Sequence, residues 1–518
     1  MAIVLQFFTN KGLLLAQSPT PKGNFDNVMR VVRQQYVDPV NIDSIIAQVT
    51  AEYLNRPATI EAILTKLDPH SSYFPPKEYM EFRQGLSSSI KGIGIEFFIY
   101  RDTVMISRTM DGGPAQQHGL RTSDRIIRID DSIMTGKAAN FDNVIPRLIG
   151  KRGTDVNVTF LRHGDITPRQ ITITRDSIPI TSVDAVAMLD KQTGYILISR
   201  FAQSTGTEFA TALTKLKSQG MKKLILDLRE NFGGLMSQAI AIADQLLPDK
   251  RLIVYTEGNK SLRENRVATP GGLFETGPLI VLVNQNTASS AEILTAGLQA
   301  NKRAIVIGQR TYGKGLVQQL ITLDDSLSGL KLTTARYYTA DGHCIQRSYK
   351  EGTVEYLDEY AAILENGGDI PDSLAKKVTV DWGIQPDIYL SLDSSSSGKL
   401  YKLISQRDYY SEAAFRWYAD NPEMFVHIKD LSAFRNTYKV PDEMLSFFRD
   451  YVSERENQLP YNVHKLKYTE ASLKQLTPRI ATTLKAYLAR EIWNNPEMYI
   501  LLTAADEQVQ YALKLLKK

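Results

Sequence analysis

Residues 281–319, VLVNQNTASSAEILTAGLQANKRAIVIGQRTYGKGLVQQ, contain the pattern that decides the fold of this chain. An apolar strand, Leu279–Val283, ends in a polar turn, and the chain then enters a helix around Ser289. The unpaired N–H groups and the dipole at a helix N-terminus stabilise negative charge. A second strand, Arg303–Gly308, leads to Lys314, which lies between two glycines. The pattern predicts an α/β core in which Ser289 and Lys314 follow adjacent strand ends.

The composition of the 518 residues excludes several classes of protein. A chain of this length should form two to four domains, and a net charge of +4 is too small to indicate a nucleic-acid partner. The single cysteine, Cys344, excludes an intramolecular disulfide framework and a multi-cysteine zinc site. The six histidines show no metal-ligand spacing. We therefore expect no metal and no cofactor.

The N-terminal part of the chain divides into a leader and a helical region. Residues 1–24 begin with short apolar segments that resemble a poor or truncated signal peptide, without a basic start, and the alternative is a disordered or misassigned leader. The chain has no apolar run of about 20 residues that could span a membrane. Residues 25–87 show helical spacing of apolar residues. They include a turn at Asp68–Phe74, in which His70 is interpreted as structural because it is far in sequence from the nucleophile turn.

Residues 88–178 change to short strands and turns with two ordered motifs. Lys91–Phe97 alternates glycine and apolar residues, and Gly113–Leu120 is followed by Asp124–Asp130. This region resembles a PDZ domain of the bacterial protease type, although His118 and Ser123 replace the usual small residue and glycine. In such a domain the loop binds a peptide's C-terminal carboxylate and the peptide adds a strand to the sheet edge. The loop residues here are Gly92, Ile93, Gly94 and Ile95.

Residues 179–392 follow an α/β pattern, and residues 393–518 are helical. The apolar strand Lys223–Leu228 ends in a turn that contains Gly233 and Gly234. That turn could cradle a phosphate, but it has neither P-loop nor GxGxxG spacing, and the alternative is an N–H group directed at an oxyanion. Four serines within Asp393–Gly398 indicate a linker. Beyond it, an apolar helix with Thr477 as N-cap and Pro478 at the first position indicates packing or assembly; the apolar residues are Ile480, Leu484, Tyr487, Leu488 and Ile492.

Ser289 and Lys314 form a candidate nucleophile and base. A serine hydroxyl needs an adjacent base to attack an amide, and burial can lower the pKa of a lysine, which is ordinarily near 10.4, by several units. Gln318 could orient the amine without adding charge. The N–H groups of Ser290 and Gly234 could bind the oxyanion. From position alone, Ser289 could equally be an N-cap and Lys314 a solvated turn residue.

The segments DLRENFGG, TASSAEI, TYGKGLVQQ, YYTADGHCIQ and GIQPDI resemble those of a carboxyl-terminal processing protease. The LDPHSSYF turn and the PDZ-like region stand in the order of that family, and the resemblance covers roughly residues 25–390. It implies that Ser289 is the nucleophile, Lys314 the base and Gln318 the orienting glutamine. It places the oxyanion donors at Gly234 and Ser290. The family's usual Ser-Ala-Ser-Glu ending reads Ser289-Ser290-Ala291-Glu292 here, so Ser290 remains an alternative nucleophile.

The resemblance implies a ClpP/crotonase-like α/β protease core with an inserted PDZ domain and helical N- and C-terminal regions. It also implies a periplasmic or cell-envelope serine endopeptidase that cleaves unfolded or C-terminally marked polypeptides with free C-termini. The alternative is a non-catalytic peptide-binding scaffold of the same fold. An acyl-CoA enzyme rests on fold analogy alone and lacks a phosphate-cradling motif. The sequence leaves open a homo-oligomer and a regulatory adaptor.

Overall fold

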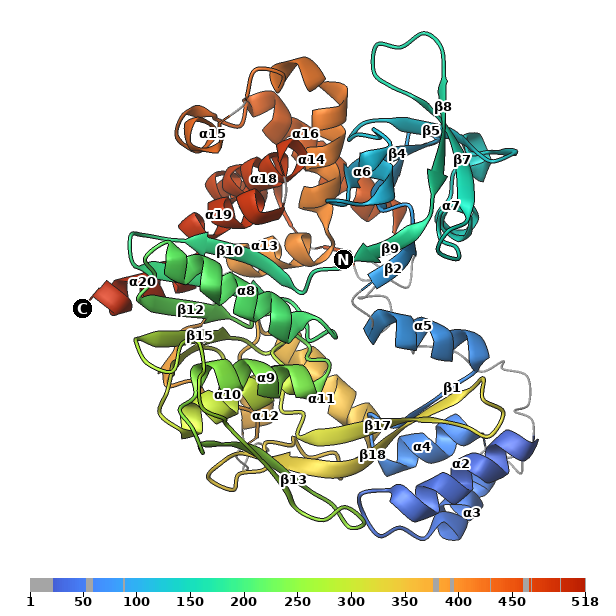
Figure 1. Ribbon diagram of the computed structural model, residues 1–518, viewed down its shortest axis with the longest axis vertical. Helices are drawn as coiled ribbons and strands as arrows, with labels where there is room; N and C mark the ends of the chain where they lie inside the picture. Colours follow the sequence, from blue (N-terminus) through green and yellow to red (C-terminus); the bar gives the residue numbers. More distant parts are fainter. Residues whose placement is uncertain are drawn as a thin grey trace. The chain divides into compact units, whose positions relative to one another are not determined.

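The computed structural model describes residues 22–52, 59–86, 89–375, 382–391, 396–428, 430–459, 465–466, 468–493 and 495–517. The chain forms two compact units (Figure 1). The core unit comprises the described residues before 88, residues 182–392 and residues from 508 onward. The second unit comprises residues 88–181 and 393–507. Most of the predicted leader, residues 1–21, lies outside the described residues.

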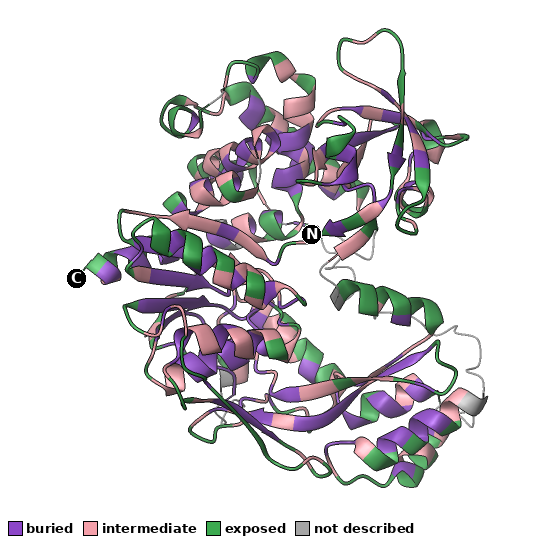
Figure 2. Ribbon diagram, viewed as in Figure 1, coloured by how far each residue is buried: buried purple, intermediate pink, exposed green. Residues whose placement is uncertain are grey.

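The core unit is built on a six-stranded sheet with the strand order β10-β11-β12-β15-β16-β19. The strands from β11 to β19 are parallel, and β10 pairs antiparallel with β11. Central strands β12 and β15 are almost wholly buried (Figure 2), as expected for parallel strands covered on both faces. The strands span Val183–Met188 (β10), Thr193–Ile198 (β11), Lys223–Asp227 (β12), Leu279–Val283 (β15), Ile305–Gly308 (β16) and Ile388–Tyr389 (β19).

The connections of this sheet place the predicted turns together. Asp227 of β12 is in register with Leu282 of β15, so the turns that follow these parallel strands leave the same sheet edge. Helices α8 (Thr205–Ser218), α9 (Met236–Leu246) and α10 (Ser290–Ala300) pack in sequence, α8 on α9 and α9 on α10. Their buried apolar faces join the strands in one core. Helices α11 (Thr353–Glu365) and α12 (Asp372–Ala375) belong to the same unit.

A second sheet of the core unit has the strand order β1-β18-β13-β14, and β17 also pairs with β18. The strands span Ser72–Phe74 (β1), Leu252–Glu257 (β13), Glu264–Val267 (β14), Leu316–Thr322 (β17) and Gly329–Tyr338 (β18). The N-terminal region is joined to this sheet because β1 pairs with β18. Its helices α2 (Lys22–Gln35), α3 (Ile42–Glu52) and α4 (Ile60–Leu67) share a buried core with β18. Helix α5 spans Pro76–Leu86.

The second unit contains an inserted β-rich domain. Its larger sheet has the order β3-β4-β5-β7-β8, and β6 pairs with β5. The first and last strands of the domain, β2 and β9, form a separate two-stranded sheet. Within the described residues β3 pairs only with β4, so it is an edge strand. The elements span Ser89–Gly92 (β2), Ile95–Tyr100 (β3), Thr103–Thr109 (β4), Pro114–Gln117 (α6), Arg125–Ile129 (β5), Ser132–Ile133 (β6), Phe141–Leu148 (α7), Asp155–Leu161 (β7), Arg169–Thr174 (β8) and Asp176–Pro179 (β9).

The second unit also contains a helical domain with its own buried core. Its first helix begins at Ser396, within the predicted serine linker. In α18 the predicted apolar residues Ile480, Leu484 and Leu488 are buried, but the N-cap is Leu476 rather than Thr477. The N-cap prediction is therefore wrong by one residue, and Pro478 occupies the second helical position. The helices span Ser396–Gln406 (α13), Tyr409–Asp420 (α14), Leu431–Thr437 (α15), Asp442–Gln458 (α16), Glu470–Gln475 (α17), Thr477–Ile492 (α18) and Asn495–Ala505 (α19).

The last helix, α20 (Glu507–Lys517), differs from the sequence expectation. The sequence placed all of residues 393–518 in one helical region, but α20 from Gln508 onward packs in the core unit. The amide of Gln508 and the carbonyl of Leu516 both bond to core residues, and Val509 and Ala512 are fully buried. An amphipathic helix carries no sequence signal for which core buries its apolar face.

Candidate active site

Ser289 lies where strand β15 turns into helix α10, as predicted. Its backbone has φ +56° and ψ −118°, a conformation that is strained for a residue other than glycine and costs about 1–3 kcal/mol. The side chain is half-buried and forms a capping box with Glu292, in which the Ser289 hydroxyl oxygen accepts from the backbone N–H of Glu292 and keeps its own proton. Ser289 therefore holds the N-cap position of α10 while its hydroxyl remains available for chemistry.

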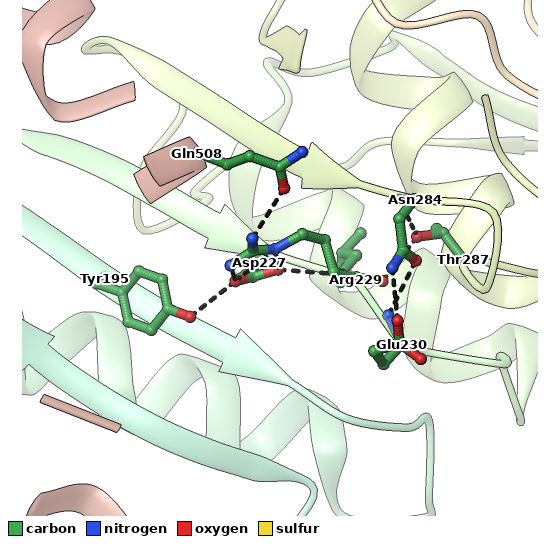
Figure 3. Close-up of polar contacts among 8 residues, drawn as sticks. Tyr195, Asp227, Arg229, Glu230, Asn284, Thr287 and Gln508 are labelled. Carbon is green, nitrogen blue, oxygen red and sulfur yellow. Dashed lines mark hydrogen bonds and ion pairs between the residues drawn. The ribbon is translucent and has the colours of Figure 1, made fainter. Parts of the chain in front are cut away.

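The turn before Ser289 is fixed to the turn after β12. Thr287 Oγ1 accepts from the N–H of Asn284 and donates to the carbonyl of Leu228. Asn284 exchanges two hydrogen bonds with Glu230, at 3.1 Å from the Glu230 N–H and 2.7 Å to its carboxylate (Figure 3). Asn286 also donates to that carboxylate at 2.5 Å. Asn284, Asn286 and Thr287 are buried and Glu230 is exposed, and their hydrogen bonds join the two turns in one polar cluster.

Glu292 joins the serine turn to the lysine loop. This carboxylate is fully buried and accepts four hydrogen bonds. One oxygen accepts from the backbone N–H groups of Ser289 and Lys314, at 2.8 and 2.9 Å. The other accepts from the Thr311 hydroxyl and the Gly313 N–H, at 2.6 and 2.7 Å. Burial raises the pKa of Glu292 above its ordinary value, although these four hydrogen-bond donors act in the opposite direction. A single side chain thus fixes the backbones of both candidate residues.

Tyr337, on β18, is a second connection between Ser289 and Lys314. Its hydroxyl lies 2.5 Å from the carbonyl oxygen of Lys314 and 3.2 Å from that of Ser289. The side chain is 1% exposed, and burial raises the pKa of the phenol well above its ordinary value. The hydroxyl therefore stays protonated and donates to the two carbonyls. Sequence reasoning did not single out Tyr337, because nothing local to YYTADG indicates a contact across two loops.

Gly233, Gly234 and Ser290 form the predicted oxyanion region. A Cβ on Gly233 would lie 2.8 Å from the Ser289 Cβ and 3.0 Å from the Ser290 nitrogen, so only glycine allows this approach. The N–H groups of Gly234 and Ser290 donate no hydrogen bond within the described residues. The Ser290 hydroxyl donates to the carbonyl of Gly234 at 2.8 Å. Two unused N–H groups beside a serine are what a developing oxyanion requires.

Lys314 is half-buried, and burial lowers the pKa of its amine to about 8. The charges of Asp68 and Glu292 act in the opposite direction, but burial outweighs them. The loop is held closely, because a Cβ on Gly313 would lie 2.8 Å from the ring of Trp382, and one on Gly315 2.9 Å from the nitrogen of Gln346. At pH 7 about a tenth of such an amine is neutral, several hundred times the fraction for an ordinary lysine.

Gln318, on β17, donates its side-chain amide to Thr333 Oγ1 at 3.3 Å and makes no hydrogen bond to Lys314 within the described residues. Lys314 and Ser289 are likewise joined by no hydrogen bond there. The structure joins Ser289 and Lys314 through Tyr337 and Glu292, whereas the side chain of Gln318, in the same unit, contacts Thr333.

The turn at Asp68–Ser71 also lies near Lys314. Nothing in the sequence indicated this, because the two segments are far apart along the chain. Ser71 Oγ donates to Asp68 at 2.7 Å and accepts from the Thr333 N–H at 3.1 Å. Burial, and then the charge of Lys314, lower the pKa of His70 well below its ordinary value, so this imidazole is neutral. His70 contacts the Tyr356 hydroxyl at 3.3 Å. The predicted turn is limited to Asp68–Ser71, because Ser72–Phe74 form strand β1, and Ser71 contacts Thr333, the residue that accepts from Gln318.

The loop Gly92–Ile95 belongs to the second unit. Ile93 is buried and Gly94 has φ +78°. The carbonyls of Ile93 and Gly94 accept from Ala115 and Met110, whereas their N–H groups donate no hydrogen bond within the described residues. Within the described residues, no group of three or more His, Cys, Asp or Glu side chains is placed to hold a metal ion. No described helix is long and apolar enough to cross a membrane.

A serine at a strained strand-to-helix turn, two unused N–H groups and a half-buried lysine are the groups that a serine peptidase would need. Residues 192–356 match the sequence model of peptidase family S41. The carboxyl-terminal-processing protease of Synechocystis sp. is 34% identical over 356 residues, which cover 66% of this chain and 79% of that protein. The carboxy-terminal processing protease CtpA of Bacillus subtilis is 30% identical over 364 residues, which cover 69% and 75%. The chain belongs to the carboxyl-terminal-processing protease family and is a serine-type peptidase.

Among solved structures, the photosystem II D1 C-terminal processing protease matches with a TM-score of 0.40 and 26% identity, covering 72% of this chain and 93% of that one. Residues 400–494 match a family of unknown function, DUF8443. These residues lie in the helical domain of the second unit.

Proposed function

We propose that this protein is a Ser-Lys endopeptidase that cleaves unfolded or C-terminally marked polypeptides, with Ser289 as nucleophile and Lys314 as general base. Neutral Lys314 takes the proton of the Ser289 hydroxyl as Oγ attacks the scissile carbonyl carbon. The N–H groups of Gly234 and Ser290 bind the resulting oxyanion, and the protonated lysine then gives its proton to the leaving amine. The observation that carries this proposal is the strained Ser289 turn, tied to the Lys314 loop through Glu292 and Tyr337.

Ser289 is the better nucleophile of the two adjacent serines. The hydroxyl of Ser290 is buried and donates its proton to the carbonyl of Gly234, whereas that of Ser289 accepts within the capping box with Glu292 and so keeps its proton for removal by a base. Ser289 has a positive φ angle and Ser290 does not, so Ser289 is the strained residue of the turn. Gln318 orients the Lys314 amine once it leaves Thr333, so the present arrangement is a resting state.

The inserted domain acts as a PDZ domain that captures substrate C-termini. Its loop Gly92–Ile95 offers unused N–H groups at Ile93 and Gly94 for a terminal carboxylate. The following strand, β3, is an edge strand on which a substrate tail adds as a further strand. Tail capture favours the state in which Lys314 reaches Ser289, so peptide binding controls the chemistry.

The test is cleavage of an unfolded protein that carries an apolar tail with a free C-terminus, compared with an amidated copy of the same tail. We expect Ser289→Ala and Lys314→Ala to lose activity by at least about 10³-fold, and Ser290→Ala to retain it within about tenfold. The amidated substrate should be cleaved more slowly. Full activity of Ser289→Ala together with loss in Ser290→Ala would move the nucleophile by one residue.

A non-catalytic peptide-binding scaffold is the second candidate, favoured by the lack of a hydrogen bond between Ser289 Oγ and Lys314 Nζ in the described residues. A serine-directed covalent probe separates the two. Labelling of the wild type but not of Ser289→Ala supports the protease, and tail binding without labelling supports the scaffold.

Export to the periplasm or cell envelope is part of the proposal, because a tail-reading protease would meet marked substrates there. Cell fractionation with and without residues 1–24 tests it, and retention of both forms in the cytoplasm would contradict it. Light scattering of the purified protein tests self-association. Co-purification from the same cells tests for a regulatory adaptor.

A further inference from the structure

The helical domain contacts the outer face of strand β3, within the second unit. Residues of β3 alternate: Ile95, Phe97 and Ile99 pack on the core of the inserted domain. The residues between them contact the helical domain. Glu96 accepts from Arg490 of α18 at 2.6 Å, and the Phe98 ring lies 5.0 Å from that of Phe415.

Two further features strengthen this contact. Tyr100, at the end of β3, donates to Asp420 at 2.5 Å. Glu96 lies between Arg490 and Arg108; burial alone would raise its pKa, but the two guanidinium groups outweigh burial and hold the pKa at about 2. The Glu96 carboxylate therefore stays charged at neutral pH, and so does its ion pair with Arg490. Among the described strands β3 pairs only with β4, and these contacts are made by its side chains rather than by its backbone.

The other end of the helical domain continues into α20, which packs in the core unit. Gln508 is 2% exposed and uses both ends of its amide. Its oxygen accepts from Arg229 at 2.8 Å (Figure 3). Its nitrogen donates to the carbonyl of Leu390 at 2.8 Å. The carbonyl of Leu516, near the end of α20, accepts from Lys223.

Arg229 opens the turn that leads to Gly234. Its guanidinium forms hydrogen bonds to both carboxylate oxygens of Asp227, and Asp227 accepts from the Tyr195 hydroxyl (Figure 3). The next residue, Glu230, has φ +59° and is bonded to Asn284. Hydrogen bonds therefore hold Arg229, Glu230 and Gly233 of the turn that leads to Gly234.

The connection between the two ends has almost no slack. Helix α19 ends at Ala505 and α20 begins at Glu507, so Asp506 alone separates them. Consecutive Cα atoms are about 3.8 Å apart, so the chain between the two helices adds little length of its own.

We propose that the helical domain is a mechanical link that couples substrate-tail binding at β3 to the oxyanion turn, with Gln508 as a positioning residue that acts through Arg229. This inference rests on the proposed tail-reading protease. It gives residues 400–494, the part that matches a family of unknown function, a role as the transmitter between the peptide-binding domain and the catalytic core.

The decisive variant adds slack without removing a contact: a flexible Gly/Ser insertion of about six residues directly after Asp506. The full-length protein is assayed on the free and the amidated tail substrates. In the wild type the ratio of the two kcat values should be about tenfold or more, and the insertion should reduce it to within about twofold of one. Cleavage of the amidated substrate should change by less than about twofold. The same insertion after Gly271, in an exposed loop of the core unit, is the matched control and should leave the ratio unchanged.

Gln508 provides a second measurement. Gln508→Ala should lower kcat about five- to twentyfold with KM unchanged, and Gln508→Glu, which keeps an acceptor for Arg229, should restore most of it. A tail ratio in the insertion variant equal to that of the wild type would overturn the inference and leave the proposed function standing. If Ser289 is not labelled by the serine-directed probe, or if the wild type does not distinguish the tails, the proposed function itself fails.

Discussion

The burial of Lys314 makes a prediction about stability that is separate from catalysis. Lowering the pKa of a lysine from 10.5 to about 8 means that the folded protein holds this proton less tightly than the unfolded chain. At about 1.4 kcal/mol for each tenfold change in proton affinity, the shift corresponds to about 3 kcal/mol of lost stability at neutral pH. We therefore expect Lys314→Met to be inactive and more stable than the wild type by about 2–3 kcal/mol at pH 7.

The sign of the pH dependence follows from the same shift. Below pH 8 both states hold the proton and the wild type carries the full penalty. Between pH 8 and 10.5 the unfolded chain keeps the proton and the folded protein releases it, so wild-type stability rises with pH. The advantage of Lys314→Met should therefore shrink through this window and be small above about pH 10.5.

Urea unfolding at several pH values measures this difference. Trp382 is buried against the Lys314 loop and reports on the core unit once Trp417 and Trp493 of the helical domain are replaced by Phe. Lys260→Met, at an exposed position, is the matched control and should change stability by less than about 0.5 kcal/mol. This prediction would be wrong if Lys314→Met were no more stable than the wild type at pH 7, or if its advantage did not depend on pH. Either result would mean that burial does not disfavour the charged form of Lys314.

Three other predictions concern the groups around the site and the interface in the second unit. Tyr337→Phe removes the hydroxyl that contacts the carbonyls of Ser289 and Lys314, so kcat should fall about 10- to 100-fold with KM nearly unchanged, as measured by steady-state cleavage. Glu292→Gln removes a charge that raises the pKa of Lys314, so the acidic limb of the residual kcat/KM profile should move to lower pH; a limb that stays in place would contradict this. Burial raises the pKa of Glu491 to about 8, so the folded protein binds this proton more tightly than the unfolded chain does. Wild-type stability should therefore fall as the pH rises from about 4.5 to 8. By urea unfolding, Glu491→Gln should be more stable than the wild type by a few kcal/mol at pH 9 and by little at pH 4.

The sequence predicted those parts of the site that follow from local pattern. Apolar strands of the right length and a polar turn placed Ser289 at a helix start, and two glycines marked the Lys314 loop. The same reasoning could not find the role of Tyr337, nor could it place the predicted turn that begins at Asp68 near the site. Ser71 and Thr333 are 262 residues apart, and their contact exists only because β1 pairs with β18. Pairing between such distant strands has no local signal, since a strand's alternation does not specify its partner.

The same limit applies to the division of the chain into units. A serine-rich stretch indicated a break near residue 393, and composition alone gave no sign that α20 returns to the core unit. In the core unit α20 buries apolar residues such as Val509 and Ala512 and makes a buried polar contact between Gln508 and Arg229. Such contacts are specific because an unsatisfied buried amide or guanidinium is costly, but they are visible only when both partners are in place.

The carboxylates near Lys314 explain how the site combines a neutral base with a rigid frame. A carboxylate close to a lysine normally stabilises the ammonium form and would prevent it from acting as a base. Here Glu292 and Asp68 each accept several hydrogen bonds from backbone N–H and hydroxyl groups, so much of their negative charge is balanced by donors other than the lysine. Burial then remains the largest influence on Lys314, and its pKa stays near 8 despite two neighbouring acids. The carboxylates thus fix the backbones around the base without recharging it, and removing their backbone donors should cost more activity than removing the charge itself.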